Sequence, residues 1–421
     1  MRVHWILGVL TLTACATQDE EGLGEVEQET FGFLPNNFPF LNSSGISTTW
    51  STAGYVDLQN EFSEDFGTNG RDCGHCHKPA EGWTVSAASV RRVFDRTDGL
   101  DPIFRTVDGA NSPHADVSTE AARRSAYSML LNRGTIRVGI PIPLDAEFEL
   151  VAVDDPYGYA TAAELSLFRR PLPSANLTLI PQVMWDGRVP GATVPAALSD
   201  QANGATEGHA QADAPLAPEV RQAIVEFETG LFNAQTIGFG TGLLSGGGAN
   251  GGAKALSSQA FVAARFNLFD AWATSDNPHR QAVFRGQELF NTKTRPTGGG
   301  ACRVCHSAEN SGTNRNGVFF TVGTSDGSRR APDQPLYTLR QLSTGTEITT
   351  TDPGRALITG RWVDMNKFKV PSMRGLAARA PYFHGGSANT LAEVVDFYEA
   401  SLGFDFTDAE EADLVAFMAA L

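Results

Sequence analysis

The chemistry of this chain is concentrated in its cysteines and in the histidine that follows two of them. Five cysteines are present, and four of them stand in two copies of the pattern Cys-x-x-Cys-His, at residues 73–77 and 302–306. This pattern is the attachment signature of c-type haem, in which two thiols form thioethers with the porphyrin and the adjacent histidine binds the iron. The sequence therefore predicts two covalent c-type haems, held by Cys73, Cys76, His77, Cys302, Cys305 and His306.

A zinc site or a redox-active dithiol is the alternative interpretation of one Cys-x-x-Cys pair. Zinc would require the two pairs to lie close together, and it would leave the histidine after each pair without a role. Two complete copies of the longer pattern, with only Cys15 left over, favour haem.

The first residues of the chain predict export. Arg2 precedes an apolar run, residues 3–12, that is too short to span a bilayer and is typical of a secretory signal. Residues 12–15 (Leu-Thr-Ala-Cys) resemble a bacterial lipobox, in which Cys15 is lipidated, whereas residues 14–16 also fit ordinary signal cleavage. We expect a protein of the periplasm or outer membrane of a Gram-negative bacterium, held to the membrane by acyl chains on Cys15 alone.

The charge of the chain argues against nucleic acid and anionic lipid as partners. The formal net charge is −16 over 421 residues, and both of those partners require a basic surface. A basic protein partner remains compatible with this charge. Part of the charge is local, because residues 19–29 are rich in Asp and Glu and are typical of a solvated tether.

The apolar pattern predicts helices and few strands. Apolar residues at helical spacing predict helices over residues 119–131, 220–232, 261–272, 281–290 and 390–402. Thr407 and Glu410 form a capping box that opens a last helix.

The predicted fold is mainly α, with two cytochrome c-like haem domains joined by a Gly-rich linker. A hydrophobic content of 41% in a chain of this length suits about two domains. The glycines of residues 238–252 predict that this stretch builds no element of its own. The expected divisions are a signal segment 1–15, an acidic tether and N-terminal wrap 16–54, an N-terminal haem domain 55–237, the linker 238–254 and a C-terminal haem domain 255–421.

The second axial ligand of each iron decides what each haem can do. An open face lets peroxide or oxygen bind, whereas a filled face gives an electron-transfer haem. The candidates downstream of the second motif are Met365, Met373, Tyr398 and Met418. Residue type alone favours methionine, because thioether is the usual ligand of electron-transfer haems. Met418 fits a core position, and spacing excludes neither Met365 nor Met373.

Four segments together resemble the bacterial di-haem cytochrome c peroxidases and MauG over most of residues 55–421. They are residues 185–188 (Trp-Asp-Gly-Arg), 367–375 (Lys-Phe-Lys-Val-Pro-Ser-Met-Arg-Gly), 380–386 (Ala-Pro-Tyr-Phe-His-Gly-Gly) and 391–395 (Leu-Ala-Glu-Val-Val). The resemblance implies that the second haem takes its distal ligand fourteen residues after the histidine of Pro-Tyr-Phe-His, which is Met in the peroxidases and Tyr in MauG. Here that residue is Tyr398, so the resemblance implies ligation by His306 and Tyr398. The alternative is that Tyr398 packs beside Phe397 and a methionine binds the iron.

The resemblance also implies a charge-transfer residue and a peroxide site. Trp185 takes the place of a tryptophan that lies between the haems, although a Trp packed in the core is the ordinary alternative. The family has a Gln and a Glu over the first haem, ten residues apart; Gln201 fits the first position, and Gln211 stands at the second. Because cleavage of peroxide needs a proton acceptor and donor, we predict His209 in that role, followed by Glu207. A surface histidine on a loop is the alternative for His209.

The first haem is predicted to have an open, five-coordinate iron. In the peroxidases a histidine sixteen residues after the proximal one blocks this iron, and here that position is Val93. His114 is the nearest substitute, but it fits an ordinary loop residue.

Many relatives hold a calcium ion between the two haems, so the resemblance implies calcium here. Its expected ligands are the carbonyl oxygens of Arg379 and Pro381 and an Asn side chain. Asp108 and Asn111 are weak candidates for the side-chain oxygen.

Residues 169–173 (Arg-Arg-Pro-Leu-Pro) and 209–211 (His-Ala-Gln) are similar to the MbnH subgroup, MauG relatives that oxidise tryptophan in a partner protein of copper handling. The implied function is oxidation of aromatic residues, tryptophan above all, of a partner protein. Hydrogen peroxide, or oxygen plus electrons, would oxidise the first haem, and a high-valent di-haem state would form through Trp185. One alternative is a cytochrome c peroxidase that takes electrons from a small redox protein. The other is a non-enzymatic electron-transfer cytochrome with both irons six-coordinate.

Overall fold

The computed structural model describes residues 32–262 and 264–421. The predicted signal segment, the lipidation site Cys15 and the tether up to residue 31 lie outside the described residues. Helix accounts for 33% of the structure and strand for 17%, so the prediction of a mainly α fold is only partly correct, and the expectation of few strands is wrong. Within the described ranges, no helix is both long enough and apolar enough to cross a membrane.

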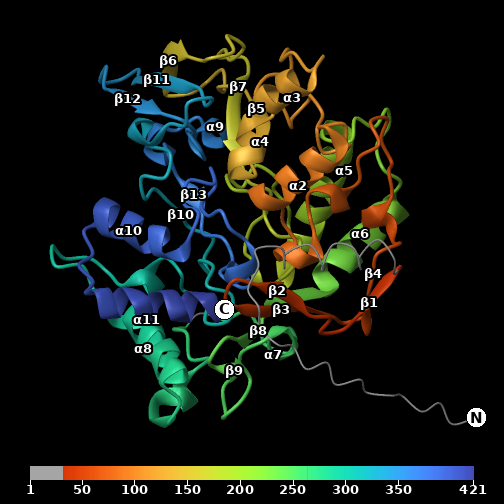
Figure 1. The fold of residues 1–421 in the computed structure, drawn as a ribbon. Coiled ribbons are helices and arrows are strands. Elements are labelled where there is room, and N and C mark those ends of the chain that lie inside the picture. Colours follow the sequence, from red (N-terminus) through yellow and green to blue (C-terminus); the bar gives the residue numbers. More distant parts are fainter. Residues whose placement is uncertain (1–31, 263) are drawn as a thin grey trace, which may run out of the picture.

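The segment expected to wrap around the surface forms strands instead. The strands of this region are β1 (Phe33–Pro35), β2 (Phe40–Asn42), β3 (Gly45–Ser51), β4 (Tyr55–Asp57), β8 (Leu231–Gly238) and β9 (Gly242–Leu243). β3 pairs antiparallel with both β2 and β8, which gives a four-stranded sheet of order β2-β3-β8-β9 (Figure 1). The start of the described chain is thereby fixed beside residues almost two hundred positions later.

Helices occur in both halves of the chain. Those of the first half are α2 (Ala87–Thr97), α3 (Glu120–Ala126), α4 (Ser128–Arg133), α5 (Val194–Gly208) and α6 (Pro218–Gly230). Those of the second half are α7 (Ala253–Ser257), α8 (Pro278–Thr292), α9 (Ala356–Thr359), α10 (Leu391–Leu402) and α11 (Asp408–Ala419). The helix predicted over residues 119–131 is divided at Tyr127, and the one predicted over residues 220–232 ends at Gly230, where β8 begins.

The helix predicted over residues 261–272 is wrong, because the described residues of this segment form a loop that ends in a short 3-10 turn. Two amide side chains of α8 hydrogen-bond the loop backbone. Gln287 Oε1 accepts from the N–H of Phe269 at 2.9 Å, and Asn291 bonds both the N–H and the carbonyl of Phe266. Buried backbone groups need partners, and these amides supply them without a helix.

The last helix begins as predicted. The Thr407 and Glu410 side chains form a capping box at the start of α11, each bonding the other's backbone N–H. α11 packs closely on α8 at Gly286, where a Cβ atom would lie only 1.9 Å from the carbonyl oxygen of Asp413. Only glycine permits this approach of the two backbones.

Strands from the first half of the chain pair with strands from the second. The elements are β5 (Ile136–Ile140), β6 (Phe148–Asp154), β7 (Leu165–Arg169), β10 (Phe319–Phe320), β11 (Leu336–Gln341), β12 (Glu347–Thr350) and β13 (Phe368–Lys369). β6 pairs antiparallel with β11, and side chains from both halves share one apolar cluster. The division into domains at residues 55–237 and 255–421 stays a prediction, but the two ranges interlock through this sheet.

The Gly-rich stretch 238–252 is packed into the structure. It contains β9, and Leu244 within it is fully buried. The carbonyl of Gly246 accepts a hydrogen bond from Trp272 Nε1 at 2.8 Å. The expectation that this stretch builds no element is therefore wrong, whereas its role as a linker between domains stays a prediction.

Candidate haem sites

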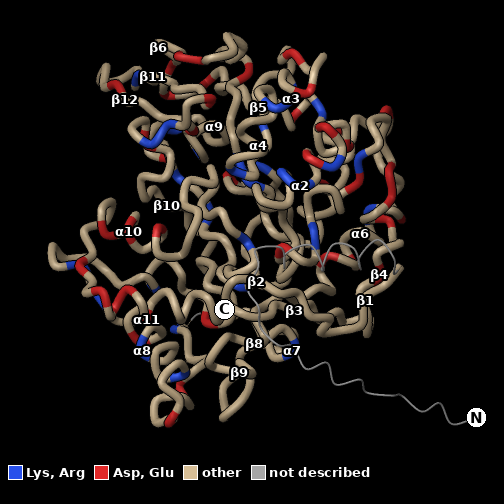
Figure 2. Tube along the Cα trace, viewed as in Figure 1, with Lys and Arg blue, Asp and Glu red and all other residues tan. Residues whose placement is uncertain are grey.

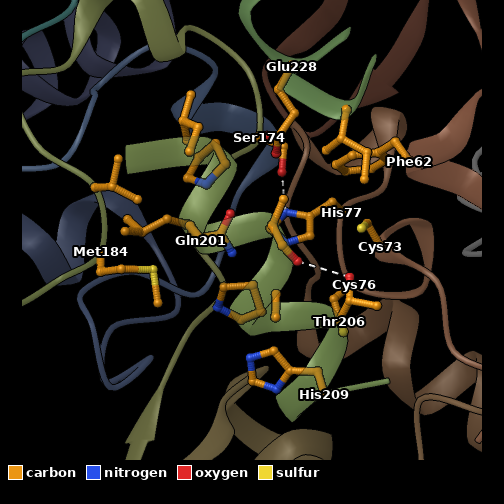
Figure 3. A pocket seen from close by; sticks show the side chains of 18 of the residues that line it. Phe62, Cys73, Cys76, His77, Ser174, Met184, Gln201, Thr206, His209 and Glu228 are labelled. Carbon is orange, nitrogen blue, oxygen red and sulfur yellow. Dashed lines mark hydrogen bonds between the residues drawn. The ribbon is translucent and has the colours of Figure 1, made fainter. Parts of the chain in front are cut away.

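Each Cys-x-x-Cys-His motif faces a large cavity. The first cavity has a volume of about 1520 Å³ and is lined by Cys73, Cys76 and His77 (Figure 3). The second has a volume of about 1760 Å³, and it is lined by the corresponding residues, Cys302, Cys305 and His306. Each motif begins with a 3-10 turn, which brings both thiols and the imidazole of a motif to one cavity.

Both motif histidines are oriented by a hydrogen bond at Nδ1. His77 Nδ1 lies 3.0 Å from the carbonyl oxygen of Trp83 and 2.8 Å from Ser174 Oγ. His306 Nδ1 lies 2.6 Å from the carbonyl oxygen of Gly312. These bonds place the proton on Nδ1 and leave Nε2 free to bind iron. Burial lowers the pKa of each imidazole to about 4, so both are neutral, as a metal ligand must be.

Buried cations beside the cavities fit the carboxylates of haem. Lys369 lines both cavities, and burial lowers its pKa to about 8. All three side-chain nitrogens of Arg374 are buried without a hydrogen-bond partner, and burial lowers its pKa to about 9. No carboxylate of the described residues forms an ion pair with either side chain. Figure 2 shows Lys and Arg gathered in the middle of the molecule. Each haem carries two propionates, which would neutralise such charges.

The first cavity contains a histidine–aspartate pair, whereas the prediction named a single base. His209 and Gln201 both line the cavity, as predicted (Figure 3). His209 Nδ1 hydrogen-bonds Asp108 Oδ2, and the other oxygen of this buried carboxylate pairs with Arg71. Burial alone would raise the pKa of Asp108, but the bond from His209 and the charge of Arg71 hold it below its usual value. Glu207 is exposed and does not line the cavity.

Asp108 is the residue of this pair that sequence reasoning missed as part of the peroxide site. It stands 101 positions from His209 and belongs to no motif, so no spacing rule could have found it. Its only sequence signal was its type, which suggested a calcium ligand. The fold brings it to the cavity beside Arg71, which stands two residues before Cys73 of the first haem motif.

The two residues considered as blocking groups lie elsewhere. Val93 is buried in the core beside α4, and His114 contacts the ring of Tyr159. Among the described residues that line the first cavity, the histidines are His77 and His209. Met184 also lines it, and the sequence analysis did not single out this thioether. A five-coordinate first iron stays a prediction.

Tyr398 lines the second cavity from α10. Its ring contacts those of Phe383 and Phe397, and its hydroxyl has no hydrogen-bond partner within the described part of the chain. Burial raises the pKa of this hydroxyl, so a positive iron would be needed to stabilise the phenolate.

The methionine candidates separate into those near the second cavity and one far from it. Met365 is buried in the cluster shared by the strands and does not line the cavity. Met373 and Met418 do line it. The sulfur of Met373 packs against Gly312, which holds His306 from the side opposite to Nε2. This places Met373 behind the proximal histidine rather than across from it.

Trp185 lies between the two cavities, because it lines both of them together with Lys369 and Ser372. Its Nε1 donates to the carbonyl oxygen of Arg170 at 2.8 Å, and its own carbonyl accepts from the N–H of Lys369 at 2.8 Å. The neighbouring Asp186 is buried in an ion pair with Arg169. A role of Trp185 in charge transfer between two haems stays a prediction.

Three proteins are similar to this chain in sequence. Cytochrome-c peroxidase IdrP2 of Denitromonas iodatirespirans is 30% identical over 254 residues, which cover 56% of this chain and 64% of the relative. Cytochrome c551 peroxidase of Nitrosomonas europaea is 29% identical over 36% of this chain and 38% of its own length. Methylamine utilization protein MauG of Methylophilus methylotrophus is 28% identical over 36% of this chain and 41% of its own length.

The chain is similar in sequence to di-haem cytochrome c peroxidases and to MauG. The match spans less than two thirds of the length of each of these relatives. No family model matches the sequence. A crystal structure of a MauG-like protein associated with microbial copper homeostasis overlaps with a TM-score of 0.36 at 19% identity, over 62% of this chain and 75% of that one.

Proposed function

We propose that this chain is a MauG-like di-haem oxidoreductase that uses hydrogen peroxide, or oxygen plus electrons, to oxidise an aromatic residue, tryptophan above all, of a partner protein. The observation that carries the proposal is the placement of Trp185 between a cavity with a proton-transfer pair and a cavity lined by Tyr398. When bound, the two haems supply the redox chemistry with peroxide.

Residues of the first cavity would handle the protons of peroxide. His209 Nδ1 is held by Asp108, so Nε2 is the atom that accepts a proton from peroxide and returns it to the leaving oxygen. The carboxylate of Asp108 stabilises the charged imidazole, and Arg71 fixes that carboxylate. Gln201 lines the same cavity and would orient the oxidant by hydrogen bonding.

Residues of the second cavity would let it share oxidising equivalents. A phenolate from Tyr398 is a hard anionic donor that favours oxidised iron, whereas a thioether favours Fe(II). Trp185 offers a path between the cavities for electrons withdrawn from a docked protein. The net charge of −16 would favour a partner with a basic docking surface. We also propose export to the periplasm, with a lipid anchor at Cys15.

A conventional cytochrome c peroxidase is the second candidate. Two observations favour it: relatives carry that name, and Met418 lines the second cavity as a possible thioether ligand. Such an enzyme would reduce peroxide with electrons from a small redox protein. An electron-transfer cytochrome would need Met184 or another group on the first iron, and it would bind neither cyanide nor peroxide.

Spectra of the purified diferric protein, before and after one equivalent of hydrogen peroxide and without reductant, test the proposal. We expect visible and near-infrared changes from both haems at once, because Trp185 connects their cavities. The Tyr398→Met variant should lose this joint response. A wild-type protein that reacts only after one haem has been reduced would be a conventional peroxidase, and our assignment of Tyr398 would be wrong.

A further inference from the structure

A side chain lies where the family resemblance implies calcium. The expected ligands are the carbonyl oxygens of Arg379 and Pro381, next to residues that line the second cavity. In the structure both oxygens accept hydrogen bonds from one nitrogen, Nη1 of Arg170, at 2.6 Å in the case of Arg379. The two carbonyls are therefore already bound to a positive group.

The other oxygens considered for calcium are bound elsewhere. Both carboxylate oxygens of Asp108 are taken by Arg71 and His209. The amide oxygen of Asn111 accepts from the N–H of Met129 at 3.2 Å. Within the two described ranges, no cluster of three or more His, Cys, Asp or Glu could hold a metal ion.

The charge around these carbonyls also opposes a divalent cation. Burial, and then the charge of Arg170, lowers the pKa of Arg379 to about 10, so both guanidinium groups stay charged at neutral pH. In the described part of the chain, neither group forms an ion pair with a carboxylate. The amide oxygen of Asn233 is buried without a partner, but it lies beside the side chain of Arg379. Calcium sites normally supply carboxylates. The nearby buried carboxylate, Glu81, accepts hydrogen bonds from Ser86 with both of its oxygens, and the groups at the two carbonyls are cations. The residues present do not fit calcium.

We propose that Arg170 replaces calcium as the cation that joins the two haem cavities. Its Nη1 holds the 379–381 segment of the second cavity, and its Nη2 donates at 2.5 Å to the carbonyl of Val85, on the chain that follows His77. Its own carbonyl accepts from Trp185 Nε1, and its N–H donates to the carbonyl of His384 at 2.7 Å. Arg170 is thus a positioning residue that fixes Trp185 between the cavities. The inference rests on the two haem sites, not on the identity of the oxidised substrate.

This inference is tested by the calcium content of the holo-protein and by the effect of calcium on its melting temperature. Neither measurement depends on enzyme activity. The protein is dialysed against a calcium chelator and then against metal-free buffer, and its metal is measured by mass spectrometry. We expect no stoichiometric calcium and a melting temperature that neither the chelator nor added calcium changes. One calcium per chain in the wild-type protein, or a melting temperature that falls in chelator, would overturn the inference whatever the outcome of the peroxide spectra.

The variant Arg170→Asn should make the stability of the protein depend on calcium. It frees the two carbonyls and offers an amide oxygen, so we expect a lower melting temperature that calcium partly restores. Arg91→Asn is the matched control, because the exposed Arg91 also donates to a backbone carbonyl, that of Leu131 at 2.8 Å, but not to the 379–381 segment. This control should show no response to calcium. If Arg170→Asn does not fold, the wild-type measurements decide alone.

Discussion

The two haem cavities offer different chemistry to the same kind of cofactor. The first is lined by His209, Asp108 and Gln201, which can accept, donate and orient protons. The second is lined largely by aromatic and aliphatic side chains, and Tyr398 lines it from α10. Peroxide cleavage moves protons as well as electrons, whereas sharing an oxidising equivalent moves electrons alone. Under the proposed function, the first haem would react with peroxide and the second would store oxidising equivalents.

The largest expected effect comes from removing the proton-transfer group of the first cavity. His209→Gln should slow the reaction with hydrogen peroxide by roughly 10²–10⁴-fold, because general acid–base catalysis contributes that much. Asp108→Asn should slow it less, since the imidazole remains but loses its orienting carboxylate. Stopped-flow spectroscopy of the diferric protein measures both rates. Glu207→Gln is the control on the exposed side of α5 and should react at the wild-type rate. If Glu207→Gln slowed the reaction as much as His209→Gln, Glu207 would be the proton-transfer group instead.

A smaller effect is expected when the ligand of the second cavity is changed. Tyr398→Phe should alter the spectrum of the second haem and raise its reduction potential by on the order of 100 mV, because an anionic oxygen donor favours oxidised iron. Spectroelectrochemical titration would resolve the two haems. Met373→Leu removes a thioether that lies behind His306 and should leave the axial signature unchanged. The opposite result, a change only in the methionine variant, would make the second haem a His/Met site.

The residues close together in sequence could be assigned in advance, and those brought together by the fold could not. The motifs at 73–77 and 302–306 specify their own chemistry, because one turn of chain holds all three groups. Tyr398 and Trp185 were reached through resemblance, and both line the expected cavities. Asp108 and Arg170 act through partners 101 and more than two hundred positions away, which no local pattern reveals.

Tertiary contacts also explain the errors in the predicted fold. The segment 261–272 has the apolar content of a helix, but Gln287 and Asn291 bind its backbone and make a buried loop possible. The Gly-rich stretch was expected to be unstructured, yet Trp272 and neighbouring residues hold it by its carbonyl groups. The strand pairing of β6 with β11 joins residues far apart in the chain, and alternation within such short strands gives little signal.

The smallest effect is expected from a titratable side chain close to the motif histidine of the first cavity. The hydrogen-bond partner of the second motif histidine does not titrate. Ser174, which contacts His77 Nδ1, lies next to Glu228, a buried carboxyl on α6 that lines the same cavity (Figure 3). Burial raises the pKa of Glu228 to about 8, from an ordinary value of 4.5. Behind His306 the corresponding partner is the Gly312 carbonyl, which does not titrate.

The raised pKa predicts how stability depends on pH. Between about pH 4.5 and 8 the folded protein binds a proton at Glu228 that the unfolded chain releases, so this residue lowers the free energy of unfolding as pH rises, up to a limit near pH 8. Glu228→Gln removes the titration, and its advantage over wild type should grow with pH to at most roughly 5 kcal/mol. Thermal unfolding of both proteins from pH 5 to pH 9 measures this difference. The exposed Glu226→Gln on the same helix is the control and should follow wild type at every pH.

Above pH 8 the charged carboxylate of Glu228 should also lower the reduction potential of the first haem alone. The two haems would then differ in how their reduction potentials depend on pH. A pH effect of equal size on both potentials would instead place its origin outside the pair formed by Ser174 and Glu228.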